Sequence, residues 1–97
     1  MGGGGSKPTN WANPSTLKDH FKRHGKDFNS TSAKEYASKA QKFYKNKAKY
    51  QYKTDGNGVT RVYDSKTNSF GAYNAKGKTI TFFKPTGGQR YFDRQKG

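Results

Sequence analysis

Two histidines, His20 and His24, are the side chains of this 97-residue chain that titrate closest to neutral pH. They are four residues apart, so on a helix both imidazoles lie on one face. Lys22, Arg23 and Lys26 flank them, and nearby cations disfavour imidazolium and lower its pKa. The pair therefore suits acid–base chemistry with a neutral imidazole at neutral pH. Two half-buried histidines on a basic helix, without any chemistry, would show the same pattern.

Acidic residues and cysteines are too few for metal chemistry. The chain has no cysteine and six carboxylates, of which Glu35 fits a helix cap and Asp55 and Asp64 fit turns. The remaining acids form no cluster for Mg²⁺, and no third ligand completes a metal site with the histidine pair. We expect no metal and no cofactor. A nuclease of this composition would use His, Lys, Arg, Thr and Tyr, which suits RNA because its 2′-hydroxyl is an internal nucleophile.

One strand pattern places further functional groups together. Along residues 79–84, alternation predicts that Thr81 and Phe83 share one face with Thr79, while Ile80 and Phe82 form an apolar face that packs on helices. The first face offers two hydroxyls and an aromatic ring beside cations, which suits a nucleotide site. Threonine and phenylalanine also have high strand propensity, so a purely structural strand is the alternative.

The charge of the chain points to a polyanionic partner. Lysine and arginine outnumber aspartate and glutamate by 20 to 6, a formal charge of +14. Such a charge on a small domain is typical of proteins that bind polyanions. Arg61 on a neighbouring strand and Lys84 beside Phe83 would supply phosphate-binding cations. A non-catalytic nucleic-acid-binding module or an adhesive domain would suit the same charge, so composition leaves three functions open.

The chain divides into four segments. Residues 1–6, MGGGGS, have the composition of a cloning linker, and residues 7–14 form a polar lead-in arm. Residues 15–92 form a single small domain, and residues 93–97 form a polar tail that we expect to fray. No apolar run approaches the roughly 20 residues that a membrane span needs.

Local signals predict two helices followed by strands. The first helix starts at Asn13-Pro14 and stops near Gly25, and the second starts at Ser32 and ends near Asn46. Short strands are then predicted near residues 50–52, 59–63, 69–73, 78–84 and 89–92, joined by tight turns. The sequence therefore predicts an α+β fold, with two N-terminal helices packed on a four- to five-stranded antiparallel sheet.

Four segments of the chain resemble a known family. They are LKDHFKRHGKDF from Leu17, the Tyr-x₃-Ala-x₂-Phe pattern of the second helix from Tyr36, the segment from Arg61 to Gly71, and GKTITFFKP, which ends at Pro85. Together they resemble the colicin D-like branch of the BECR ribonucleases, a superfamily that includes barnase, EndoU, colicins and RelE. These are C-terminal toxin domains of bacterial polymorphic and contact-dependent inhibition systems. The resemblance covers roughly residues 15–92 and implies a BECR-like fold.

The resemblance also implies site residues. His24 matches the catalytic histidine of the family, and Arg23 and Lys22 match the basic residues just before it. Thr81 matches a strand hydroxyl that is Ser in colicin D-like domains, and Phe83 matches an aromatic that is Trp there. His20 and Arg61 recur less uniformly in similar toxins. The changes to Thr and Phe keep the chemical type and leave the choice of substrate open.

The activity implied by the resemblance is metal-independent cleavage of tRNA. His24 would take a proton from a ribose 2′-hydroxyl, and His20 or Tyr91 would protonate the leaving oxygen. Arg23, Lys22 or Arg61 would stabilise the phosphoryl charge together with Thr81. The residues expected to bind the substrate are Phe83, Lys84, Tyr91 and Lys26.

The resemblance further implies partners and a place of action. The partners would be tRNA and an acidic immunity protein that covers His24 and the basic surface. We expect a monomer without membrane anchoring. It would be secreted or delivered at the cell surface within a larger effector, and would act in the cytoplasm of the target cell.

Overall fold

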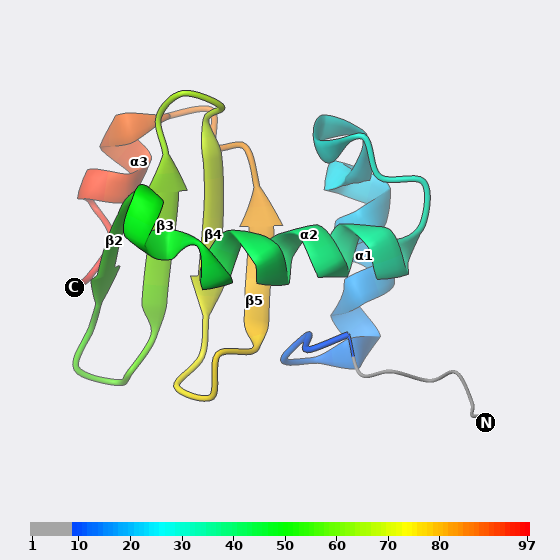
Figure 1. Cartoon of the computed structure of the whole chain (residues 1–97), viewed down its shortest axis with the longest axis horizontal. Coiled ribbons are helices and arrows are strands. Elements are labelled where there is room, and N and C mark those ends of the chain that lie inside the picture. Colours follow the sequence, from blue (N-terminus) through cyan, green and yellow to red (C-terminus); the bar gives the residue numbers. More distant parts are fainter. Residues whose placement is uncertain (1–8) are drawn as a thin grey trace.

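The computed structural model describes residues 9–97. The linker expected at residues 1–6 and the first two residues of the lead-in arm lie outside the described residues. The predicted α+β fold is confirmed: helices pack with one four-stranded antiparallel sheet. Helix α2 (Ala33–Lys45) runs across one face of the sheet, and α3 (Gln89–Asp93) lies behind the strands β2 (Gln51–Thr54) and β3 (Thr60–Asp64) (Figure 1). Helix α1 (Pro14–His24) stands beyond the edge formed by β5 (Thr79–Phe83) (Figure 1). The sheet therefore has two faces, referred to here as the α2 face and the α3 face.

Helix α1, Pro14–His24, begins and ends as its caps predict. The Asn13 side chain accepts a hydrogen bond from the Ser15 amide at 3.2 Å, as an N-cap residue does. The helix passes into the short helix η1, Gly25–Phe28. A Cβ at Gly25 would lie 2.6 Å from the Phe21 ring, so close packing requires glycine there.

Helix α2, Ala33–Lys45, also begins at its predicted cap. Ser32 Oγ accepts from the Glu35 amide at 3.1 Å, and the Glu35 carboxylate accepts from the Thr31 amide at 2.7 Å. The first bond satisfies an amide that the first helical turn leaves without a partner, and the second ties the residue before the cap to the helix. The buried stripe of this helix consists of Tyr36, Ala37, Ala40 and Phe43. A short helix η2, Lys47–Lys49, leads to the sheet.

The sheet is an antiparallel meander in the order β2-β3-β4-β5. Its strands are β2 (Gln51–Thr54), β3 (Thr60–Asp64), β4 (Ser69–Tyr73) and β5 (Thr79–Phe83). Adjacent strands in the order are also adjacent in sequence, so tight turns suffice to connect them.

A β-bulge in β5 makes its pattern of faces differ from the predicted alternation. Thr81 pairs with Ala72 and Thr79 pairs with Tyr73, so Ile80 has no partner of its own. One extra residue on one strand reverses the alternation beyond it. Thr79 is therefore buried on the α2 face with Phe82, while Ile80 is 39% exposed. The prediction that Ile80 packs on the helices was wrong, whereas Phe82 does face α2.

The fifth strand predicted at residues 89–92 was also wrong, because this segment is helix α3, Gln89–Asp93. Tyr91 packs on Phe70 and Phe83, and Phe92 stacks on Tyr63, all on the α3 face. Consecutive residues point to opposite sides of a strand but lie about 100° apart on a helix. A helix therefore lets both rings reach the same face of the sheet.

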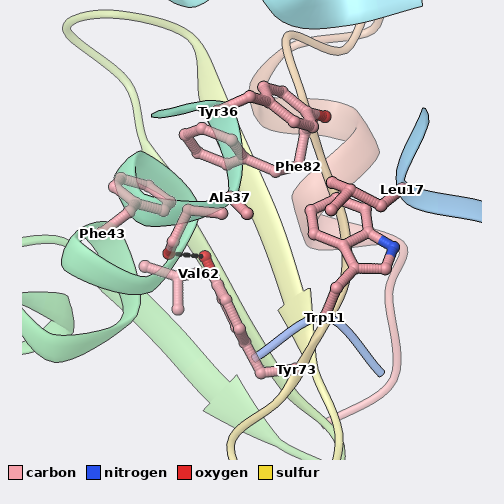
Figure 2. Close-up of a cluster of buried hydrophobic side chains, with 9 residues drawn as sticks. Trp11, Leu17, Tyr36, Ala37, Phe43, Val62, Tyr73 and Phe82 are labelled. Carbon is pink, nitrogen blue, oxygen red and sulfur yellow. Dashed lines mark hydrogen bonds between the residues drawn. The ribbon is translucent and has the colours of Figure 1, made fainter. Parts of the chain in front are cut away.

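The main core lies between α2 and the sheet (Figure 2). Tyr36, Val62 and Tyr73 are completely buried there. The Tyr73 hydroxyl donates to the Ala40 carbonyl at 2.7 Å, and the Tyr36 hydroxyl donates to the Phe82 carbonyl. Both phenols thus have acceptors, as buried hydroxyls require.

The described part of the lead-in segment packs against the rest of the domain. Trp11 is 3% exposed and belongs to the main core. The segment also pairs with the β5 edge, since the Thr79 amide donates to the Asn10 carbonyl at 2.7 Å. The predicted tail likewise makes contacts: Asp93 ends α3, and the Lys96 carbonyl accepts from Arg61 at 3.2 Å.

Candidate functional site

The structure places both histidines at the junction of α1 and β5. The His20 and His24 rings lie 6.2 Å apart between centroids. His20 Nδ1 is 3.4 Å from Thr81 Oγ1, and the His24 ring is 5.5 Å from the Phe83 ring. All four side chains are partly exposed. These residues, His20, His24, Thr81 and Phe83, are called the histidine site below.

The apolar stripe of α1 explains why these groups meet. Leu17 is buried in the main core, and Phe21 packs 6.2 Å from the Tyr36 ring on the α2 face. This packing fixes the rotation of the helix, so the flank that carries the histidines meets the other face of β5. The bulge at Ile80 then sets Thr81 and Phe83 on that face.

Burial lowers the pKa values of both histidines. For His20 the largest cause is desolvation, followed by the charge of His24, while Asp19 acts in the opposite direction. For His24 desolvation again dominates; Asp27 raises the pKa and Arg23 lowers it. The sequence predicted lowered pKa values from cations alone, whereas the structure makes burial the first cause. Neutral imidazole is therefore the favoured form near neutral pH.

Trp11 is a residue of this region that the sequence interpretation missed. Its ring meets His20 edge-on with centroids 5.2 Å apart, and its indole N–H donates to Thr16 Oγ1 at 3.0 Å. The indole therefore buries one side of His20 and positions it. The available signal was that Trp11 is the only tryptophan of the chain and lies beside a predicted helix start.

Aromatic rings extend the histidine site across the α3 face. The Phe83 ring lies 5.5 Å from Tyr91, and Tyr91 lies 4.9 Å from Phe70, all edge to face. Tyr91 was predicted to bind substrate, and the structure does bring it next to Phe83. The partly exposed rings of Phe83 and Tyr91 offer a surface on which a base can stack.

The basic residues of α1 differ in how they lie relative to the histidines. Arg23 is exposed and paired with Asp19 at 3.3 Å. It is close enough to His24 to lower its pKa. Lys22 precedes His24 by two residues, which places it about 160° around the helix. Lys22 therefore points away from the histidine site, and Lys26 is exposed in η1.

Two other predicted cations are not brought to the histidines. Arg61 lies in the same cross-strand row as Thr81, with Ala72 between them. Its guanidinium is bound to Asp55 at 2.8 Å, which lowers the pKa of that carboxyl. Lys84 Nζ donates to the Thr67 carbonyl at 2.6 Å, at the opposite side of β5 from Phe83.

Among residues 9–97, no group of three or more His, Asp or Glu residues is arranged to hold a metal ion. The same part of the chain has no helix long and apolar enough to cross a membrane. The sequence matches no protein-family model and no curated protein.

Proposed function

We propose that the protein is a metal-independent endoribonuclease that cleaves tRNA through attack of a 2′-hydroxyl on the adjacent phosphorus. The observation that carries this proposal is the histidine site itself. Two imidazoles with lowered pKa values lie 6.2 Å apart, beside a hydroxyl and a partly exposed aromatic ring. The charge of +14 supports a polyanionic substrate. The resemblance to colicin D-like toxins supports tRNA.

Two proton transfers make up the proposed reaction. Neutral His24 takes the proton of a ribose 2′-hydroxyl, and the oxygen attacks the adjacent phosphorus. The bond from phosphorus to the 5′-oxygen breaks, and protonated His20 donates a proton to that oxygen. The products are a 2′,3′-cyclic phosphate and a 5′-hydroxyl end. General acid–base catalysis of this kind contributes about 10² to 10⁴ in rate.

The neighbouring groups have supporting roles in this proposal. Thr81 Oγ1 donates to a nonbridging phosphoryl oxygen when His20 turns toward the leaving group. Arg23 on the flank of the helix supplies positive charge as the phosphoryl oxygens become more negative. Phe83 and Tyr91 stack on a flanking base. Arg61 stays on Asp55 at 2.8 Å and is not needed for the reaction.

The proposal includes the setting in which such an activity is used. A ribonuclease of this kind would stop translation, so it would act in the cytoplasm of a competing bacterium after delivery as part of a larger effector. Its producer would need an inhibitor. An acidic protein that covers His24 and the surrounding cations would be the best complement to a domain of charge +14.

The decisive experiment compares the wild type with His24→Ala in metal-free tRNA digestion. With EDTA present, we expect the wild type to yield fragments with 2′,3′-cyclic phosphate ends. His24→Ala should cut about 10² to 10⁴ times more slowly while retaining its tRNA affinity. Lys22→Ala is the matched control, because this residue lies on the same helix but points away. Unchanged cleavage by His24→Ala would refute the assignment.

The same assay separates catalysis from binding alone. A non-catalytic nucleic-acid-binding module would bind tRNA with steep salt dependence and release no fragments. An adhesive domain would show neither fragments nor salt-dependent binding.

A further inference from the structure

A recess on the α2 face, away from the histidine site, has the composition of a nucleotide pocket. Its volume is about 270 Å³, slightly below the range of about 300 to 1,000 Å³ that is typical for drug-sized ligands. One wall comes from the second half of α2, and another comes from the turn between β3 and β4. Aromatic side chains from η1, α2 and β5 line the space between. It is called the aromatic recess below.

Stacked rings form the apolar lining of the aromatic recess. Phe28 lies on Phe82 with centroids 3.9 Å apart and planes 18° apart. Phe43 lies on Tyr50 at 4.9 Å. Phe82 and Phe43 are buried, whereas Phe28 and Tyr50 are partly exposed despite their size. Partly exposed, fixed rings are suited to a flat, polarisable group such as a nucleobase.

Three lysines place positive charge around these rings. Lys39 Nζ donates to the carbonyls of Phe28 and Asn29. Lys84 Nζ donates to two acceptors within residues 67–69 and lies 4.9 Å from the centre of the Phe28 ring. Each ammonium has three N–H groups, so each keeps one for a ligand. Lys42 is exposed and makes no side-chain hydrogen bond among the described residues.

Asp64 gives the aromatic recess an acceptor on the wall formed by the β3–β4 turn. Its carboxylate accepts from the Lys66 amide at 3.0 Å and from Thr67 Oγ1 at 2.9 Å. A carboxylate has about four acceptor positions, which leaves two for a ligand. These positions suit the exocyclic amino group of a base, as in carboxylate recognition of cytosine N4.

We propose that the aromatic recess binds an unpaired nucleotide of the RNA substrate. The phosphate lies at the lysines, the base lies among the rings, and its amino edge meets Asp64. The choice of RNA as ligand rests on the proposed ribonuclease function. The aromatic recess would thus select RNA substrates by a nucleotide other than those that flank the cleaved bond.

The position of the recess relative to the histidine site determines which RNA reaches both. Phe82 and Phe83 are consecutive on β5 and point to opposite faces, one toward the aromatic recess and one toward His24. A chain that contacts both must turn around the end of β5, where Lys84 lies. A flexible single strand makes this turn, whereas a stiff double helix does not. The cleaved bond therefore lies in an unpaired segment.

The test titrates the full chain separately with CMP, AMP, UMP and inorganic phosphate, and monitors the backbone amides by NMR. We expect CMP and AMP to shift the amides of Tyr50, Asn46 and Ser69 more than UMP does. Lys42→Gln should weaken CMP binding by about tenfold or more, since it removes one charged hydrogen bond. Lys45→Gln is the matched control, one turn further along the same helix but outside the lining.

Four results would overturn the inference. They are shifts confined to Thr81 and Phe83, equal weakening by both lysine variants, equal binding of UMP and CMP, and phosphate binding as tightly as CMP. Metal-free tRNA cleavage by the same wild-type sample is measured in parallel. If cleavage is absent while CMP still binds at Tyr50, the ribonuclease proposal fails and the recess stands. If cleavage occurs without this binding, the recess fails alone.

Discussion

The two faces of the sheet each carry a pair of polar rings, and the two pairs differ in burial and in hydrogen bonding. On the α2 face, Tyr36 and Tyr73 are completely buried, and both phenol groups donate to backbone carbonyls. On the α3 face, His20 and His24 are partly exposed. Among the described residues, the histidine rings make one hydrogen bond to protein, the 3.4 Å contact between His20 Nδ1 and Thr81 Oγ1. One pair of rings has every polar atom satisfied, whereas the other keeps ring nitrogens available.

This difference in burial determines which rings can exchange protons with a ligand. Burial raises the pKa values of Tyr36 and Tyr73 still further above neutral pH, so both phenols stay protonated as hydrogen-bond donors. Burial lowers the pKa values of both histidines, which favours the neutral imidazole near neutral pH. The same physical cause therefore makes one pair inert and leaves the other able to exchange protons.

The largest expected effect comes from removing a buried ring. Tyr36→Ala should lower the free energy of unfolding by about 3 to 5 kcal/mol, because it leaves a cavity beneath α2. Urea unfolding followed by circular dichroism measures this change. The control is His24→Ala, which should shift stability by less than about 1 kcal/mol while abolishing most cleavage. Equal destabilisation by both variants would mean that the two faces do not differ as described.

The next effect is the pH dependence of cleavage. Below its pKa His24 is protonated and cannot act as base, and above its pKa His20 is neutral and cannot act as acid. Both values are lowered from 6.5, so kcat/KM should be greatest below about pH 6.5. Above the optimum it should fall about tenfold per pH unit. A plateau that extends to pH 9 would contradict acid catalysis by His20.

The same shifts predict how stability varies with pH. The unfolded chain has histidines with pKa values near 6.5, and the folded chain has lower values. The unfolded state therefore binds more protons as the pH falls below about 6.5, and folding stability decreases there. His20→Gln combined with His24→Gln should remove part of this acid sensitivity, as measured by thermal unfolding between pH 5 and 7.

A smaller effect is expected from Thr81→Val, which keeps the shape of the strand and removes the hydroxyl. Because the His20 contact is long at 3.4 Å, we expect a loss of about 2- to 10-fold in kcat/KM. Thr81→Ser should restore the rate. Rescue by Ser but not by Val would assign the effect to the hydroxyl rather than to packing.

Local signals in the sequence were enough to predict most of the fold. The predicted caps at Asn13 and Ser32 are confirmed. They were predictable because a capping side chain bonds to an amide only two or three residues away. The four strands are also confirmed, and they were predictable because turn residues separate them in the sequence. The segment 89–92 could not be assigned correctly, since its helix depends on two rings packing against distant strands.

The candidate site was predictable in part for the same reason. Spacing placed His20 and His24 on one face, and alternation placed Thr81 with Phe83. Neither could show that Arg61 is held by Asp55, or that Trp11 covers His20, because these contacts depend on tertiary packing. The bulge at Ile80 was likewise invisible, yet Thr81 and Phe83 still share a face because both lie after it.

The smallest expected effect distinguishes the two basic residues beside His24. Arg23 lowers the pKa of both histidines, so Arg23→Gln should raise the pH optimum slightly and lower kcat/KM a few-fold. Lys22 lies about 160° around α1 from His24, so Lys22→Gln should change neither quantity. Both variants lose one positive charge, so a general effect of charge on tRNA binding would appear equally in both. A pH–rate profile for each variant at fixed salt therefore shows whether the position on the helix or only the total charge matters.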